Sequence, residues 1–196
     1  MSRLFSCRTA RWAPVLATLT FSAPLAAQST AESPTLPRGS VAVFDVALYT
    51  AGANKQETTD TSHAALATTR LRSKLQELLG PALADSAAVT ARARAPETRA
   101  IAGDQPCNVI VACTKAVGRE LGATWVVMAK LSKTSNLIWL LTGQLINVRT
   151  DEIVMDDSTE LKGDPEPMVN AGVRIFAERV ARMVRERGAG QQARGT

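Results

Sequence analysis

Two cysteines have the spacing in this chain that is most suggestive of chemistry. Cys107 and Cys113 bound the stretch CNVIVAC, and the third cysteine, Cys7, lies near the start of the chain. A thioredoxin-like pair would be spaced C-x-x-C, and a structural zinc site needs about four ligands. If Asn108 caps a helix, Cys107 precedes the cap and Cys113 lies in the second turn, within reach of a disulfide. The spacing favours a disulfide, with free buried thiols and a metal or redox site as alternatives.

The other reactive residue types do not form a recognisable catalytic set. His63 is the single histidine, and its neighbour Ser62 is more simply interpreted as a helix cap. The sequence contains no nucleophile elbow, phosphate-binding glycine loop or dinucleotide fingerprint. Asp156 and Asp157 are adjacent in an expected strand, so their side chains point to opposite faces. We therefore predict no catalytic residue, no metal site and no cofactor.

Arginines form a small basic cluster at Arg92, Arg94 and Arg99. The cluster has no interleaved aromatic residues, so a solvated face or a partner contact is favoured over nucleic-acid binding. The formal charge of the whole chain is +5. Without the three arginines of the first 27 residues, 20 basic and 18 acidic residues remain, a net charge of +2. A nearly balanced chain gives no electrostatic reason to expect a nucleic-acid partner.

The first 27 residues have the layout of a secretory signal peptide, with three arginines followed by an uncharged run that ends in Leu-Ala-Ala. That run, residues 12–27, is shorter than the roughly 20 residues of a membrane span. We therefore predict export to the periplasm and no stable membrane span after cleavage, with an uncleaved anchor helix as the alternative. An oxidising compartment also favours the disulfide.

The remaining chain divides into a flexible lead-in at 28–40, a single α/β domain at 41–186 and a disordered tail at 187–196. Apolar periodicity predicts helices that begin near Ser62, near Ile110 and at Pro165, the first of them ending at Gly80. The expected strands are residues 41–46, a short edge strand around Val89, and 125–133, 137–148 and 153–161. Residues 49–61 and 96–106 are expected to be loops. The order β-α-β-α-β-β-β-α predicts a mixed sheet of about five strands, ending in an antiparallel meander and a packed C-terminal helix.

Two stretches carry a family resemblance: CTKAVGRELGA at 113–123 and KTSNLI at 133–138. They resemble an exported bacterial family of unknown function, the one numbered 3280, over residues 41–186 and most specifically over 107–163. The order of elements is also similar to that of the amino-terminal domain of TolB. The second resemblance implies docking of partners in the cell envelope. The first implies a link with periplasmic quinoprotein oxidation systems.

These observations favour a non-enzymatic periplasmic adaptor that docks another envelope protein. The best candidate contact is the tip of the first hairpin, Lys133, Thr134, Ser135 and Asn136, although a plain polar turn would have the same composition. The alternative is a small-ligand or metal-binding accessory protein in which loop 49–61 covers a pocket. An enzyme whose residues converge only in space is the third possibility. The sequence does not indicate an oligomeric state.

Overall fold

The computed structural model describes residues 35–50, 57–135 and 137–192. The expected signal peptide, most of the expected lead-in and the last four residues lie outside these described ranges, as do Asn136 and residues 51–56 of the expected loop. The predicted cleavage and the predicted lead-in therefore stay predictions.

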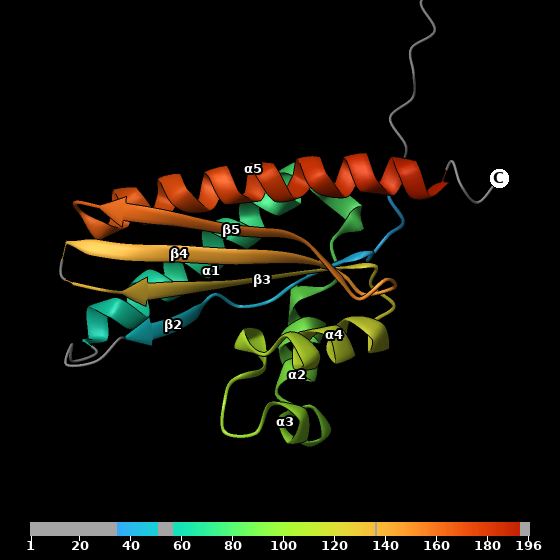
Figure 1. Cartoon of the computed structure of the whole chain (residues 1–196), viewed down its shortest axis with the longest axis horizontal. Helices are drawn as coiled ribbons and strands as arrows, with labels where there is room; N and C mark the ends of the chain where they lie inside the picture. The colour runs from blue at the N-terminus through green and yellow to red at the C-terminus, as the bar shows by residue number, and fades with distance from the viewer. Residues whose placement is uncertain (1–34, 51–56, 136, 193–196) are drawn as a thin grey trace, which may run out of the picture. The chain divides into compact units, whose positions relative to one another are not determined.

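A five-stranded mixed sheet forms the centre of the domain (Figure 1). β3 pairs in parallel with both β1 and β2, and antiparallel with β4, which in turn pairs antiparallel with β5. This confirms the predicted mixed α/β fold and the terminal meander. The strands are β1 Val41–Val43, β2 Ala47–Thr50, β3 Trp125–Lys133, β4 Ile138–Asn147 and β5 Glu152–Lys162.

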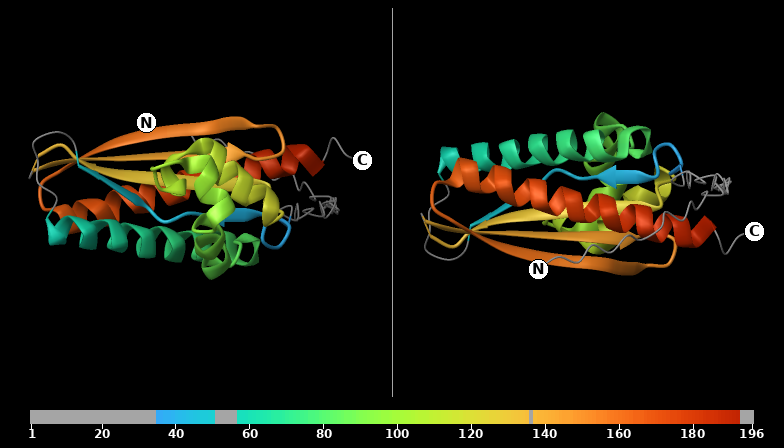
Figure 2. Two further views of the ribbon diagram at one scale, coloured as in Figure 1. Left: turned by 90° about the horizontal axis from the view of Figure 1, so that it is seen from below. Right: turned by 90° about the horizontal axis from the view of Figure 1, so that it is seen from above.

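Two long helices lie side by side on one face of this sheet (Figure 2). They are α1, Thr58–Leu79, and α5, Pro165–Gln192. Apolar residues at helical spacing explain the packing, because each helix buries one stripe against the sheet. The shared core includes Leu71 and Leu75 of α1, Val173 and Phe176 of α5, and Trp125 of β3. Both helices confirm the predicted apolar stripes.

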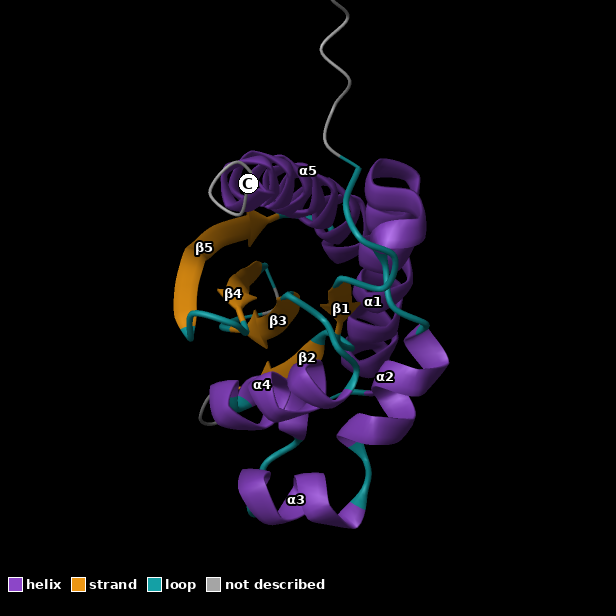
Figure 3. Ribbon diagram, turned by 90° about the vertical axis from the view of Figure 1, so that its right-hand side faces the viewer, coloured by secondary structure: helices purple, strands orange, loops and turns teal. Residues whose placement is uncertain are grey.

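The opposite face of the sheet is covered by shorter helices at one end only (Figures 1 and 3). A second core there contains Phe44, Val89, Cys113, Met128 and Ile146. The short helices on this face are α2 Ser86–Ala93, α3 Pro96–Ala102, η2 Cys107–Val109 and α4 Val111–Glu120, whereas η1 Gly80–Ala82 follows α1 and packs in the first core. Helix α4 corresponds to the second predicted helix.

Two local predictions for the segment between α1 and α4 are wrong. The expected strand around Val89 is the helix α2, whose start is capped by Asp85, because its carboxylate accepts hydrogen bonds from the amides of Ala87 and Ala88 at 3.2 and 3.3 Å. The expected loop at 96–106 contains the helix α3, which begins with Pro96 at a position where proline is favoured. A segment that the sequence predicted as a strand and a loop therefore forms two short helices.

Element boundaries also differ from the predictions. The expected strand at 41–46 ends earlier, at Val43, and a second strand, β2, begins at Ala47 and includes residues 49 and 50 of the expected loop. Helix α1 begins at Thr58 rather than near Ser62, and α5 continues to Gln192, past the expected end of the domain at 186. Asn108 lies in η2, and Ile110 occupies the N-cap of α4 in its place. Among the helices in the described part of the chain, none combines the length and the apolar character that crossing a membrane requires.

Candidate functional site

A disulfide joins Cys107 of η2 to Cys113 of α4, with their Cα atoms 5.3 Å apart. This confirms the pairing that the sequence favoured over free thiols or a metal site. The two residues are buried in the second core. The bond therefore ties the short helix η2 to the helix that covers the sheet. In the described part of the chain, no group of three or more His, Cys, Asp or Glu residues is arranged to hold a metal ion.

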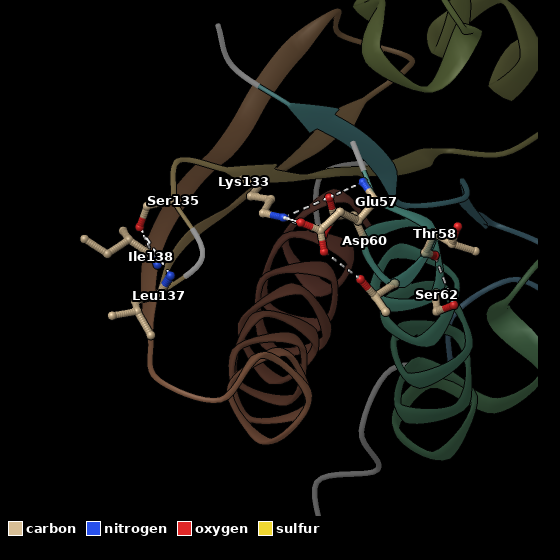
Figure 4. Close-up of polar contacts among 9 residues, drawn as sticks. Glu57, Thr58, Asp60, Ser62, Lys133, Ser135, Leu137 and Ile138 are labelled. Carbon is tan, nitrogen blue, oxygen red and sulfur yellow. Dashed lines mark hydrogen bonds and ion pairs between the residues drawn. The ribbon is translucent and has the colours of Figure 1, made fainter. Parts of the chain in front are cut away.

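A buried ion pair lies where the β3–β4 hairpin meets the start of α1. Lys133, the last residue of β3, has an exposed fraction of 4%, and Asp60 of α1 has 1%. The Lys133 Nζ donates to both carboxylate oxygens of Asp60, at 3.0 and 3.1 Å, and lies 3.7 Å from Oε1 of Glu57. Figure 4 shows Lys133 extending from the hairpin toward these two acids. The pair joins elements that are 73 positions apart in the sequence.

Asp60 also organises the first turn of α1. Its Oδ2 accepts a hydrogen bond from the backbone amide of Glu57 at 2.9 Å, so the same carboxylate caps the helix and neutralises the lysine. Burial acts to raise the pKa of Asp60, but the bonds from the Glu57 amide and from Lys133 outweigh burial and lower that pKa overall. Hydrogen bonding to Asp60 raises the pKa of Lys133, against the opposing effect of burial. Both groups are therefore charged near neutral pH.

The single histidine lies beside this ion pair. The His63 ring meets the ring of Trp139 edge to face, with centroids 5.5 Å apart. The Lys133 Nζ lies 5.7 Å from the centroid of the same Trp139 ring. A histidine, an acid and a lysine thus do gather here. Both oxygens of Asp60 already accept hydrogen bonds from Lys133, so this carboxylate is used as a counterion and a cap.

Hydrogen bonds within the turn between β3 and β4 fix the backbone of that turn. The amides of Thr134 and Ser135 donate to the carbonyl of Ile138, each at 3.0 Å. The Ser135 Oγ accepts from the amides of Leu137 and Ile138 at 3.3 and 3.1 Å. The side chain of Leu137, with an exposed fraction of 69%, is the most exposed of the large hydrophobic residues in the described part of the chain. The turn therefore presents an apolar side chain from a hydrogen-bonded backbone.

We call this region the hairpin end and define it by Tyr49, Lys133, Thr134, Ser135 and Leu137. Tyr49 belongs to it because β2 pairs with β3 so that Tyr49 lies opposite Ser132 and Thr50 opposite Lys133. The ring of Tyr49 is 54% exposed, and the Nζ of Lys130 lies 5.3 Å from its centroid.

The four residues predicted as a partner contact have different positions in the structure. Thr134 is exposed and Ser135 is partly exposed, whereas the side chain of Lys133 is buried in its ion pair. Asn136 lies outside the described residues. Leu137 lies in the turn and not in the following strand, which begins at Ile138 and not at the predicted residue 137. An apolar residue directly after the polar turn was the available signal.

The protein belongs to a family of unknown function. The family model DUF3280, described as "Protein of unknown function (DUF2380)", matches residues 39–180, which is well over half of the chain. This confirms the family resemblance carried by the stretches at 113–123 and 133–138. No curated protein matches the chain in sequence.

Several solved structures have a similar fold. The C-terminal domain of LpoB from Escherichia coli is 24% identical, with a TM-score of 0.43, and the similarity covers 68% of this chain and 88% of that chain. The PelC dodecamer from Paraburkholderia phytofirmans is 18% identical, with a TM-score of 0.38, covering 76% of this chain and 91% of that chain. TolB from Acinetobacter baumannii is 13% identical, with a TM-score of 0.38, covering 78% of this chain but 29% of that chain. These similarities concern the fold alone.

Proposed function

We propose that the protein is a non-enzymatic adaptor of the bacterial cell envelope that docks another envelope protein through the hairpin end. The observation that carries the proposal is the exposed Leu137 on a turn whose base is fixed by the buried Lys133–Asp60 pair. Because hydrogen bonds fix the backbone that carries Leu137, the turn loses little backbone freedom when a partner covers this side chain. Tyr49 adds an exposed aromatic ring at the same end of the sheet, and tyrosine is common in binding hot spots.

The polar groups near the tip suit a protein partner. Thr134 and Ser135 provide hydroxyl groups around Leu137, and such a mixture of an apolar centre with a polar rim is typical of protein interfaces. A docking role also agrees with the structural role of Asp60 and Lys133 beside the hairpin end. Because the Asp60 carboxylate is saturated by Lys133 and by the Glu57 amide, it supports the shape of the hairpin end and is not free to act as a base.

Site-specific photocrosslinking in the producing bacterium tests the docking surface. A photoreactive residue at position 137 should capture an envelope protein. The same residue at position 101 is the matched control, because Ile101 of α3 is also an exposed apolar residue (48% exposed) but lies on the other lobe. Leu137→Asp should abolish capture from a neighbouring photoreactive position, 134. Equal capture from positions 101 and 137, or none from 137, would contradict the proposal.

Export is the second part of the proposal. Its support is the signal-like composition of residues 1–27 together with a disulfide in the folded domain. Fractionation of the producing bacterium should place the protein in the periplasm, and mass spectrometry should give a chain that begins at Gln28. A cytosolic protein that keeps residues 1–27 would contradict export. The crosslinking experiment would still test docking through the hairpin end.

A further inference from the structure

A pocket of about 550 Å³ opens in the lobe formed by the short helices, away from the hairpin end. It lies between α2, α3, η2 and the segment after β1. Its lining includes the almost fully buried Phe44, Val89 and Cys107, and the more accessible Ala93 and Pro106. A volume of this size is in the range of pockets that hold small organic molecules.

The walls of this pocket are held in place by bonds of several kinds. The Cys107–Cys113 disulfide fixes η2 to α4. The side-chain amide of Asn108, also in the lining, donates to the carbonyl of Asp45 at 2.7 Å and so ties η2 to the segment after β1. Gly103 turns the chain after α3 at a φ of 64°, where its amide donates to the carbonyl of Arg99 at 2.9 Å. The pocket is therefore formed before any ligand enters.

The charges around the pocket are unequally matched. Asp45 is paired with Arg72 at 2.9 Å, and the nearby Arg92 is paired with Glu97 at 2.9 Å. Two further arginines line the pocket, Arg94 at the C-terminal end of α2 and Arg99 in α3, and neither guanidinium has an ion-pair partner among the described residues.

Asp104 is the remaining charged residue of the lining, and it also has no ion-pair partner within the described ranges. The lining as a whole has a balanced formal charge, two arginines against Asp45 and Asp104, but Asp45 is engaged by Arg72, so both arginines keep guanidinium groups without an ion pair among the described residues.

We propose that this pocket binds a small organic carboxylate. The carboxylate group is held by Arg94 and Arg99, because a guanidinium offers paired donors that match the two oxygens of a carboxylate. The apolar body of the ligand lies against Ala93 and Pro106, the apolar lining residues that are not fully buried. This inference accounts for the arginine cluster at positions 92–99, of which only Arg92 forms ion pairs with other described residues.

Titration of the mature, disulfide-bonded protein tests the inference. Phenylacetate and hexanoate serve as probes, with phenylacetamide and hexanamide as neutral analogues of the same shape. Calorimetry should give saturable binding of at least one carboxylate and at least about tenfold weaker binding of its amide, because charge-assisted hydrogen bonds are lost. In heteronuclear NMR spectra, the shifted backbone amides should lie in residues 89–108.

Matched variants distinguish the effect of the arginine charges on ligand binding from the effect of the pocket's shape. Arg94→Gln and Arg99→Gln should each weaken carboxylate binding by about tenfold, whereas Arg182→Gln, which removes an exposed guanidinium from α5, should leave it unchanged. Ala93→Leu places a larger side chain in the pocket lining and should weaken both probes while the circular dichroism spectrum stays the same. The inference is overturned if neither carboxylate binds at millimolar concentrations, if the amides bind equally well, or if the Arg94 and Arg99 variants bind like the unchanged protein.

Discussion

Reduction of the Cys107–Cys113 disulfide should destabilise the domain by a predictable amount. The bond closes a ring between residues six positions apart. For a ring of this size, the loop-entropy relation gives about 7 cal/mol/K, which is about 2 kcal/mol at about 25 °C. For a domain of this length, such a loss corresponds to a fall in Tm of roughly 4–8 °C. Reduction leaves both sulfur atoms in the core, so no cavity is created and the loss reflects the cross-link itself.

Urea unfolding followed by far-ultraviolet circular dichroism measures this difference. The oxidised protein is compared with the same protein reduced by a phosphine, and the Cys107→Ala/Cys113→Ala variant with and without the reductant controls for effects of the reductant. The midpoint should fall only in the protein that carries the disulfide. An equal midpoint for the oxidised and reduced forms would refute the reasoning, because it would mean that the ring does not restrict the unfolded chain.

Further predictions concern the core and the ion pair. Gly143→Ala would place a Cβ atom 2.2 Å from the Phe176 ring, which should cost about 1–3 kcal/mol in chemical unfolding, and Phe176→Leu should recover part of the loss. Asp60→Asn should lower the urea midpoint at neutral pH by leaving Lys133 only the more distant Glu57 as a counterion, whereas Asp60→Leu with Lys133→Met should lower it less. Asp151 forms an ion pair with Lys115, whose hydrogen bond is the main cause that lowers the pKa of Asp151, and the pKa of Asp60 is lowered as well. The contribution of these two carboxylates to folding stability is therefore complete above the ordinary pKa of 3.8 and is lost as the pH falls below it. Lys133 has the opposite pH dependence because its pKa is raised. Its contribution to folding stability is complete below pH 10.5 and is lost as the pH rises past the pKa of Lys133 in the folded protein. Urea midpoints measured across the pH range should therefore fall at both extremes, and an unchanged midpoint below pH 3.8 would contradict the assignment to Asp60 and Asp151.

The elements with strong apolar periodicity could be predicted from the sequence. Helix α5 has both an apolar stripe and a proline at its first position, and β3 and β4 of the meander are long and rich in apolar residues. The disulfide followed from the spacing of two cysteines. These features depend on local patterns, which a single sequence displays directly.

The missed elements are short or depend on distant partners. The start of α2 carried a local signal, since Asp85 precedes a run of alanines, but Val89 was given too much weight as a strand residue. β2 follows β1 after a break at residues 44–46, where no glycine or proline marks an interruption. The burial of Lys133 depends on Asp60, which lies 73 positions earlier, and no local sequence pattern around either residue predicts their contact.

The central position of β3 has a consequence for the order in which the chain can fold. Position 41 of β1 pairs with position 125 of β3, a separation of 84 residues, and β2 also needs β3 as its neighbour. Helix α1 therefore has no sheet to pack on until β3 has been synthesised, and β3 is followed closely by the two strands that complete the meander. Contacts this distant are made slowly because loop closure precedes any gain from them. The first half of the chain is thus expected to remain open and extended well into synthesis, which is the condition in which a polypeptide can still be threaded through a narrow pore.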